Sequence, residues 1–265
     1  MAIDSTARLA PNVKLGPGVE IGPGVIIDGP SRIGADTHIL AHAYIGPYTT
    51  IGADNRIGFG AIIGHEPQDY AFTGEESYTL IGDHNIIREY VTIHRGTKPG
   101  SSTRIGSHNF LMATSHLAHN TQVGDHVILV NGALVAGHVE LADRAYISGN
   151  CVIHQFCRVG TLALMRGGAR TSRDVPPYCI VDGDQTVRSL NLVGLRRTGF
   201  TPEQIRPLRE AFKILFTRKT NLSLAVKQVE AEVPLTPELS HLLEFIRASQ
   251  RGVALGPRQA QHAEL

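Results

Sequence analysis

Aliphatic residues recur at every sixth position through the first two thirds of the chain. Of the 28 positions spaced six apart from Ile3 to Met165, 25 carry Ile, Leu, Val or Met, and the exceptions are Asp69, Glu75 and Pro99. A strict six-residue period of this length is typical of a parallel β-helix, because each coil buries its apolar edge only against the next coil. The pattern therefore predicts an elongated, mainly β domain of stacked coils.

Small or β-branched residues stand two positions before the repeated aliphatic residue, as Ala43 does before Ile45. Since residues i and i−2 of a strand face the same side, both are expected to point inward, and the smaller one suits a narrow interior. Cys151 and Cys157 occupy such positions. We interpret them, together with Cys179, as reduced thiols in the core, with a disulfide or a nucleophile as the lesser alternative.

Glycine follows the aliphatic residue in many of the hexads, as at Gly16, Gly34 and Gly106. We expect these glycines to lie at the corners of the coils, where the backbone needs torsion angles that other residues avoid. Each hexad would then be a short strand that ends at a glycine corner.

Two polar segments, at about residues 65–79 and 94–104, interrupt the repeat. The aliphatic residues that flank each segment remain a multiple of six apart, so the coil is expected to continue in phase on the far side. The segments are too polar for the wall of a β-helix and too long for a corner. We expect them to project as loops, and long projecting loops often carry binding function.

The pattern changes after Asp174, where the sequence VPPY cannot continue a β ladder. Thr201, with glutamine three positions later, has the form of a capping box at the start of a helix. Asn221 and Thr236 are expected to begin two further helices. The chain is therefore predicted to form a β-helical domain over residues 1–180 and a C-terminal α-helical domain over residues 181–265.

Charge is unevenly distributed, although the formal net charge is only +1. Residues 158–219 contain 12 Lys and Arg against 5 Asp and Glu, whereas residues 1–157 contain 9 against 14. A basic region of this kind favours an acidic protein partner or a phosphate-bearing ligand. A solvated basic surface without a partner is the alternative interpretation, and we expect no nucleic-acid partner.

Hydropathy and the N-terminal sequence bear on the compartment. No stretch approaches the roughly 18 to 20 apolar residues that a membrane span requires, and the first residues lack the pattern of a cleavable signal peptide. We therefore expect a cytoplasmic protein without stable membrane insertion.

The hexads resemble those of the hexapeptide-repeat acyltransferases. This resemblance implies a left-handed parallel β-helix shaped as a triangular prism, with three hexads, or 18 residues, in each coil. Residues 18 apart would then lie one above another at about 4.8 Å. Two such columns contain chemically active residues: His119, Gly137 and Gln155 form the first, and Asn120, His138 and Phe156 form the second.

Histidines surround these columns, because His116 and His154 lie beside them. An imidazole at a solvent-exposed edge can act as a base near neutral pH, and a glycine such as Gly137 allows a backbone amide to approach a developing oxyanion. Three other readings stay open. The histidines could be tolerated corner residues, the solenoid could be purely structural, or His116, His119 and His138 could hold zinc as in gamma carbonic anhydrases.

Longer segments resemble one family over the whole chain, namely the UDP-N-acetylglucosamine O-acyltransferases. The segments that carry this resemblance are IREYVTIHRGT, SHLAHNTQVG, VAGHV, VIHQFCRVG, DVPPY and GLRRTGF. The resemblance implies transfer of a 3-hydroxyacyl group from acyl carrier protein to the sugar 3-hydroxyl, the first step of lipid A biosynthesis. It also implies a homotrimer with sites between adjacent prisms, and no cofactor beyond the carrier's phosphopantetheine arm.

The resemblance also implies roles for individual residues. His119 would be the general base for direct attack, His138 would orient the acceptor, and the Gly137 amide would stabilise the oxyanion. Asn120 occupies the position of the residue that pairs with the catalytic histidine. The implied substrate contacts are Asp69, His116, His154, Gln155, Asn191 and Arg197, and Gly167 occupies the position that limits the length of the acyl chain.

Four positions depart from the family pattern, namely Ala71, Asn120, Val193 and Thr198. An amide at Asn120 can orient an imidazole, but it stabilises an imidazolium less than a carboxylate does. The alternative is therefore a related acyltransferase that uses a 3-amino UDP-sugar or another UDP-sugar. The sister N-acyltransferase often has the same AHN sequence, but the repeats start at Ile3 and leave no room for its N-terminal uridine-binding domain.

Overall fold

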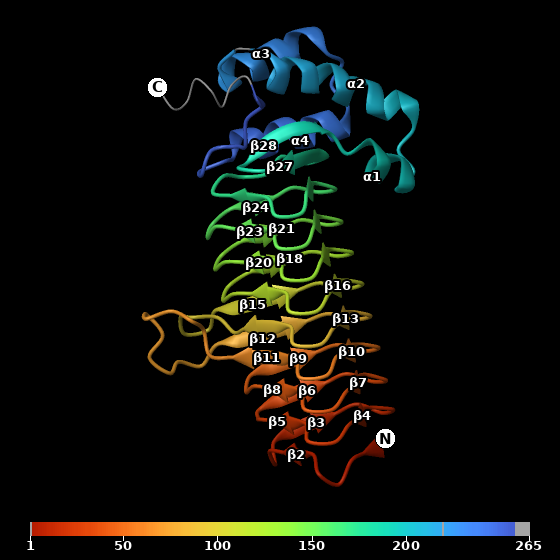
Figure 1. Cartoon of the computed structure of the whole chain (residues 1–265), viewed down its shortest axis with the longest axis vertical. Coiled ribbons are helices and arrows are strands. Elements are labelled where there is room, and N and C mark those ends of the chain that lie inside the picture. Colours follow the sequence, from red (N-terminus) through yellow and green to blue (C-terminus); the bar gives the residue numbers. More distant parts are fainter. Residues whose placement is uncertain (1, 219, 258–265) are drawn as a thin grey trace.

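The computed structural model describes residues 2–218 and 220–257 and has the shape of a long three-sided prism with helices at its C-terminal end (Figure 1). Each side of the prism is one sheet of short strands. Face A contains β1 (Ala2–Ile3), β4 (Glu20–Ile21), β7 (His38–Ile39), β10 (Arg56–Ile57), β13 (Ile86–Ile87), β16 (Phe110–Leu111), β19 (Ile128–Leu129), β22 (Tyr146–Ile147), β25 (Leu164–Met165), β27 (Cys179–Asp182) and β28 (Thr186–Leu190).

The other two faces follow the same order along the prism. Face B contains β2 (Arg8–Leu9), β5 (Ile26–Ile27), β8 (Tyr44–Ile45), β11 (Ile62–His65), β14 (Thr92–His94), β17 (His116–Leu117), β20 (Leu134–Val135), β23 (Val152–Ile153) and β26 (Arg170–Thr171). Face C contains β3 (Val13–Leu15), β6 (Ser31–Ile33), β9 (Thr49–Ile51), β12 (Tyr78–Ile81), β15 (Ser102–Ile105), β18 (Gln122–Val123), β21 (Glu140–Leu141) and β24 (Arg158–Val159). We name the edges A/B, B/C and C/A after the faces that they join.

The repeated aliphatic residues form the core of the prism, as predicted. Leu117 pairs with Val135, and Val135 pairs with Ile153, so equivalent residues of successive coils stack in register. All three side chains are fully buried. The three cysteines are buried and unpaired, which agrees with their interpretation as core thiols. The predicted parallel β-helix is therefore confirmed.

Three asparagines replace the small inward residue in the middle of face A. The Asn55 side-chain oxygen accepts hydrogen bonds from the backbone and side-chain amides of Asn85, at 2.9 and 3.0 Å. Asn85 accepts from the backbone of Asn109, and Asn109 accepts from the backbone of Val127. Because these buried amides bond from coil to coil, they fix the stacking of the coils that carry the projecting loops.

The prediction that the corner glycines need left-handed torsion angles is wrong for most of them, although Gly64 does have a positive φ of 74°. Gly34 does not have a positive φ, and a Cβ added to it would lie 2.3 Å from the backbone carbon of Gly52. Glycine is needed there because the next coil packs directly against the backbone. The left-handed torsion angles occur two positions later and are adopted by residues such as Asn120 (φ 61°), His138 (φ 59°) and Phe156 (φ 65°).

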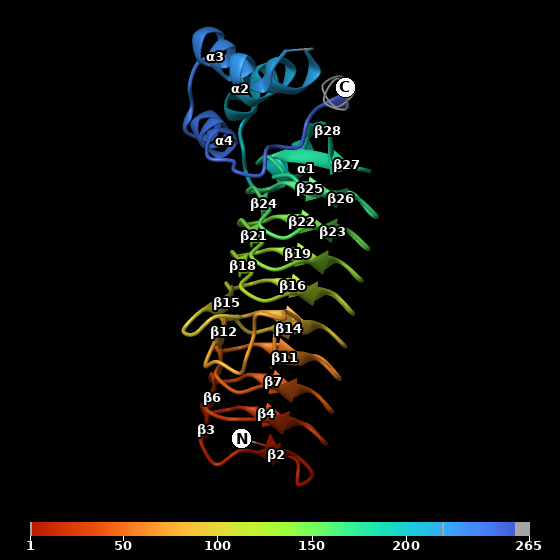
Figure 2. The same cartoon turned by 90° about the vertical axis from the view of Figure 1, so that its left-hand side faces the viewer.

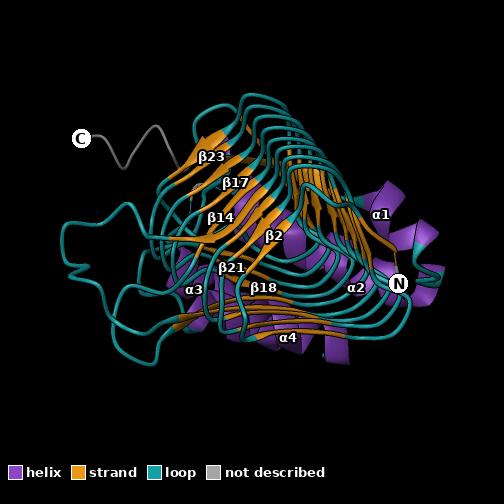
Figure 3. Ribbon diagram, turned by 90° about the horizontal axis from the view of Figure 1, so that it is seen from below, coloured by secondary structure: helices purple, strands orange, loops and turns teal. Residues whose placement is uncertain are grey.

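Both polar interruptions leave the prism at edge B/C and project to the same side (Figures 1 and 3). The first joins β11 to β12 and the second joins β14 to β15. Arg95 holds the two loops together, because its guanidinium lies 5.1 Å from the centre of the Phe72 ring and 3.7 Å from the Glu66 carboxylate. The coil continues in phase past both loops, since Ile57 pairs with Ile87 across the first and Ile87 pairs with Leu111 across the second.

Helices cover the C-terminal end of the prism (Figure 2). They are α1 (Leu192–Arg197), α2 (Pro202–Phe212), the π-helical turn η1 (Lys213–Thr217), α3 (Leu222–Glu232) and α4 (Pro237–Arg247). The predicted caps at Thr201, Asn221 and Thr236 are present, and Thr201 forms a complete capping box. The antiparallel pair β27 and β28 was not expected from the sequence. Within the described residues, no helix has the length and apolar character that a membrane crossing demands.

A buried ion pair joins the last coil to the helical region. The Arg158 guanidinium donates two hydrogen bonds to Asp174, at 2.8 and 2.9 Å, and a third to the Phe245 carbonyl. Asp174 is 1% exposed. Its backbone pairs with the segment after α4, where Ala254 donates to the Asp174 carbonyl. Asp174 thus connects the prism, α4 and the end of the described chain.

Candidate active site

The structure places the two columns of candidate residues on edge B/C, directly above the second projecting loop. The His138 amide donates to the His119 carbonyl, and the Phe156 amide donates to the Gly137 carbonyl, each at 3.1 Å. Gln155 lies one coil above Gly137 and is exposed. Residues 18 apart therefore lie side by side here, as the coil length implied.

Hydrogen bonds to Asn120 define the protonation of the His119 ring. The Thr97 amide donates to Asn120 Oδ1 at 3.0 Å, so that atom is identified as the oxygen of the side-chain amide. His119 Nδ1 lies 3.0 Å from the same oxygen. Because an amide oxygen only accepts, Nδ1 carries a proton, and in the neutral ring Nε2 is the nitrogen with the free lone pair. Asn120 thus holds His119 in the tautomer that a base requires.

Asp69 reaches His119 from the first projecting loop. Its Oδ2 atom lies 3.6 Å from His119 Nε2, and its Oδ1 atom accepts a hydrogen bond from the Ala71 amide. The contact uses the backbone of Ala71, so it does not depend on the side chain at that position. Asp69 and the free nitrogen of His119 therefore face the same point at the mouth of the site.

Gly137 lies immediately against the His119 imidazole. A Cβ added to Gly137 would lie 2.6 Å from His119 Cε1 and Nε2, so any side chain would displace the ring. In the described part of the chain, the Gly137 amide N–H has no hydrogen-bond partner. A free backbone donor thus lies beside the basic nitrogen, which is the arrangement of an oxyanion-binding amide.

The neighbouring histidines are held in their neutral form. His138 lies edge-on to His119 at 5.2 Å and stacks on Phe156 at 4.7 Å. Burial, followed by the proximity of His119, lowers the pKa of both His138 and His116. Burial also lowers the pKa of His94 to about 4. The lowered pKa values favour the neutral form of these three histidines near neutral pH.

Sequence reasoning missed the contribution of the second loop. His94 is 5% exposed and packs edge-on to His116 at 5.0 Å, and the Thr97 backbone fixes Asn120. Thr103, at the base of the loop, accepts a hydrogen bond from the Asn120 amide at 2.8 Å. The HRGT segment at the end of β14 is the feature of the sequence that marks this contribution, although by itself it indicates only the family.

Three candidate residues lie away from edge B/C. Asn191 caps α1 and donates from its side chain to the Leu162 carbonyl at edge C/A, and Arg197 lies exposed in the last turn of α1. Gly167 lies at edge A/B between β25 and β26, where a Cβ would meet only Gly149, at 3.7 Å. Within one chain these residues do not form one site with His119. His116, by contrast, lies beside the column, with Nδ1 2.7 Å from the Thr92 hydroxyl.

The basic region divides into paired and unpaired residues. Four of its arginines contact aspartates, namely Arg158 with Asp174, Arg166 and Arg188 with Asp182, and Arg170 with Asp184. Arg206 lies 4.0 Å from the Glu210 carboxylate. Among the residues that the structure describes, no ion pair is formed by Arg173, Arg196, Arg197, Arg209, Lys213 and Arg218, and Lys219 lies outside that part. The uncompensated positive charge is therefore concentrated on α1, α2 and the turn that follows.

The zinc alternative finds no support in the arrangement of the ligand atoms. Across residues 2–218 and 220–257, no group of three or more His, Cys, Asp or Glu side chains converges as a metal site would require.

Comparisons with known proteins place these observations in a family. The second domain of a family described as UDP-N-acetylglucosamine O-acyltransferase matches residues 174–254, and a bacterial transferase hexapeptide family of six repeats matches residues 30–65 and 102–137. The acyl-(acyl-carrier-protein) UDP-N-acetylglucosamine O-acyltransferase of Gloeothece citriformis is 44% identical over 74% of this chain and 71% of its own length. The chain belongs to the UDP-N-acetylglucosamine O-acyltransferase family.

Solved structures agree with this membership. The UDP-N-acetylglucosamine acyltransferase of Francisella novicida is 36% identical and superimposes with a TM-score of 0.91 over 98% of this chain and 96% of its own. The enzyme of Moraxella catarrhalis is 38% identical, with a TM-score of 0.88 over 96% of this chain and 100% of its own. The likeness to this family thus includes the prism and the C-terminal helices.

Proposed function

We propose that the chain transfers a 3-hydroxyacyl group from acyl carrier protein to the 3-position of UDP-N-acetylglucosamine, as the first step of lipid A biosynthesis. One observation carries this proposal. His119 Nε2, whose lone pair is free in the neutral tautomer, lies beside the free backbone amide of Gly137 on the edge that bears both loops. Membership of the family supplies the reaction class. The geometry supports assigning the individual roles.

His119 is proposed as the general base. Its Nε2 takes the proton of the acceptor hydroxyl while the oxygen attacks the thioester carbonyl carbon. The carbonyl oxygen becomes an oxyanion, which the Gly137 amide stabilises. When the intermediate collapses, the carbon–sulfur bond breaks and the proton on His119 passes to the departing thiolate of phosphopantetheine. No covalent enzyme intermediate is required.

The surroundings of His119 suit this role. Neutral His116 and His138 do not oppose the positive charge that His119 acquires, because burial lowers the pKa of each. Asn120 orients the ring through Nδ1 but stabilises the imidazolium less than a carboxylate would. Asp69, 3.6 Å from Nε2, is proposed to hold the sugar hydroxyls against the base.

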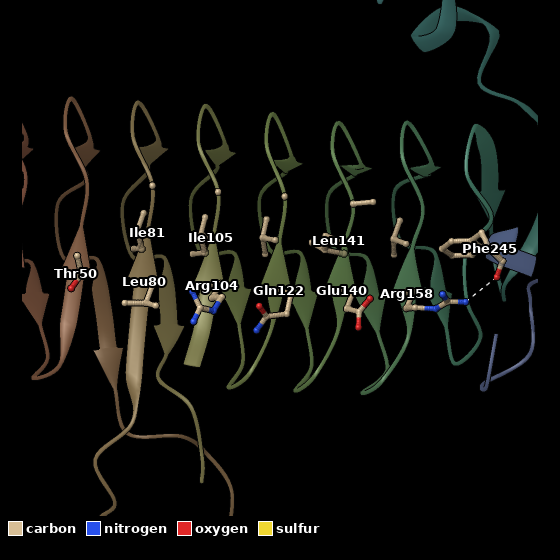
Figure 4. A pocket seen from close by; sticks show the side chains of 16 residues that line it. Thr50, Leu80, Ile81, Arg104, Ile105, Gln122, Glu140, Leu141, Arg158 and Phe245 are labelled. Atoms are coloured by element: carbon tan, nitrogen blue, oxygen red, sulfur yellow. Dashed lines mark hydrogen bonds between the residues drawn. The ribbon is translucent and has the colours of Figure 1, made fainter. Parts of the chain in front are cut away.

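The pattern of exposed apolar residues supports a homotrimer. Face B exposes Leu134 and Val152, each at 45%, and face A exposes Ile86 at 43%. The outward side chains of face C are instead mostly polar or charged, such as Arg104, Gln122 and Glu140, although Leu80 and Phe245 also line its 640 Å³ groove (Figure 4). Packing face A of one copy on face B of the next is a heterologous contact, and three such contacts close a ring of triangular prisms.

This assembly accounts for the scattered candidate residues. If face A of a neighbouring copy covers face B, the neighbour's edges A/B and C/A border that interface. Gly167 and α1 lie on those edges. We propose that the neighbour's Asn191 and Arg197 contact the nucleotide and that its Gly167 bounds the acyl groove.

Acyl carrier protein is proposed to dock on the unpaired positive charge of α1, α2 and the start of η1. Arg196, Arg209 and Lys213 form no ion pair in the described structure and are available to an acidic surface. Long-range attraction of this kind raises the association rate more than the final affinity. The four arginines that contact aspartates are less suited to the role.

A panel of substrates tests the proposed function. We expect the enzyme to use 3-hydroxyacyl thioesters of acyl carrier protein with UDP-N-acetylglucosamine, with product detected by mass spectrometry. The 3-amino analogue is the second acceptor to include, because Asn120 and Ala71 depart from the family pattern at the acceptor side of the site. A preference for the amine would replace the proposed acceptor, and no product from any donor and acceptor pair would contradict acyl transfer.

A further inference from the structure

A cavity of 560 Å³ lies beside the upper part of edge B/C. His138 and Phe156 line it from the columns above His119, and Gln250 and Arg251 line it from the segment after α4. This segment therefore returns from the helical region to the active-site edge. Neither the sequence motifs nor the proposed mechanism gives Arg251 a role.

Arg251 is anchored by neutral groups. Its guanidinium donates from Nε and Nη2 to the Ser172 carbonyl, at 3.4 and 3.2 Å, and Nη2 lies 3.2 Å from His154 Nδ1. In residues 2–218 and 220–257, no carboxylate forms an ion pair with it, and the residue is exposed. Its position is thus fixed while its charge stays available to a ligand. Arg158, which lines the same cavity, is instead neutralised by Asp174, and Glu140 also lines the cavity. His154 lies outside this lining, in a neighbouring hollow with Ser172.

The contact with Arg251 also determines the tautomer of His154. A guanidinium only donates hydrogen bonds, so His154 Nδ1 accepts from Arg251. The Gln155 carbonyl, at 3.3 Å from the same nitrogen, is the longer contact. The ring proton therefore resides on Nε2. His154 presents an N–H donor at the exposed edge, next to an uncompensated cation.

We infer that Arg251 and His154 form a binding site for a phosphate group of a substrate, and this inference rests on the proposed function. Phosphate oxygens accept hydrogen bonds from a guanidinium and from an imidazole N–H together. His154 lies two coils above His119, about 10 Å along the edge. Both the diphosphate of the sugar nucleotide and the phosphodiester of the donor arm supply this chemistry.

Binding measurements distinguish the two sources without any acyl transfer. Calorimetric titrations use UDP and, separately, phosphopantetheine. Arg251→Gln is expected to raise the Kd of the ligand that the site holds by about 10- to 100-fold. Arg251→Lys keeps the charge but loses the planar fork, so an intermediate Kd is expected. Arg32→Gln on face C removes the same charge away from the cavity and is the matched control.

The outcomes separate this inference from the proposed reaction. If Arg251→Gln binds only UDP more weakly than the wild type does, the site belongs to the nucleotide. If it binds only phosphopantetheine more weakly, the site belongs to the acyl donor. An unchanged Kd for both in Arg251→Gln and Arg251→Lys overturns the inference, as does wild-type protein that binds neither ligand. ¹⁵N NMR of His154 gives an independent readout, because protonation at Nδ1 in the wild type would also contradict it.

Discussion

Replacing His119 with alanine is expected to lower kcat for acyl transfer by about 100- to 10,000-fold. The variant loses the ring nitrogen Nε2, which lies beside Gly137 while Asn120 holds the proton on Nδ1. Rate measurements with saturating donor and acceptor test the effect on kcat directly. Binding of UDP should change much less than the rate, because the sugar nucleotide makes most of its proposed contacts elsewhere.

The fold should survive this substitution. The His119 side chain lies at the edge of the prism, and the coil is held by Leu117 and the residues stacked on it. An unchanged molar mass and unfolding midpoint would show that the loss concerns chemistry. A turnover near that of the wild type would remove His119 as the base and would favour a water-mediated or different general base at the same edge.

Replacing Asp174 with asparagine is expected to lower the free energy of unfolding by about 3 kcal/mol. The substitution keeps the shape of the side chain but leaves Arg158 without a charged partner in a site where the aspartate is 1% exposed. The same change weakens the attachment of α4, since Arg158 also donates to the Phe245 carbonyl. Denaturant unfolding at one fixed protein concentration measures the difference, because oligomers gain stability with concentration.

Asp184→Asn is the matched control for this prediction. Asp184 pairs with Arg170, and both side chains are mostly exposed, at 69% and 73%. An exposed pair of this kind contributes about 0 to 1 kcal/mol. Equal stability of the two asparagine variants would contradict the assigned role of the buried pair.

The repeat made the prism predictable, because one spacing determines both the core and the register. The six-residue period, combined with the 18-residue coil that the family resemblance implies, placed Leu117, Val135 and Ile153 in one stack, and the structure has them paired. The glycine corners were misjudged because a close approach of coils and a left-handed torsion angle both favour glycine. Only a structure distinguishes these two requirements for glycine. At Gly34 the requirement is the close approach of the next coil.

The candidate site was predictable only where it follows the repeat. Sequence spacing placed His119, Gly137 and His138 together, since they lie in undisturbed coils. The contact of Asp69 with His119 could be expected only from the family, because a loop has no period. The link from Thr97 to Asn120 and the link from Arg251 to His154 were hidden for the same reason. Both partners lie in segments that the repeat does not describe.

Asn120 illustrates how the structure changes the reading of a departure from the family. In sequence, an amide in place of a carboxylate weakens the case for an efficient base. In the structure, the Thr97 amide fixes the orientation of the Asn120 side chain, so its oxygen faces His119 Nδ1. The tautomer is retained, and what is lost is the added stabilisation of the imidazolium.

A mixed-copy experiment tests most directly whether His119 acts at a site completed by a neighbouring copy. His119→Ala and Arg197→Ala copies, each expected to be strongly impaired alone, are co-expressed with different affinity tags and purified by both. Every such trimer then contains one site with an intact His119 from one copy and an intact Arg197 from the next. The account predicts about one third of the wild-type rate. A rate no higher than that of either variant alone would contradict it.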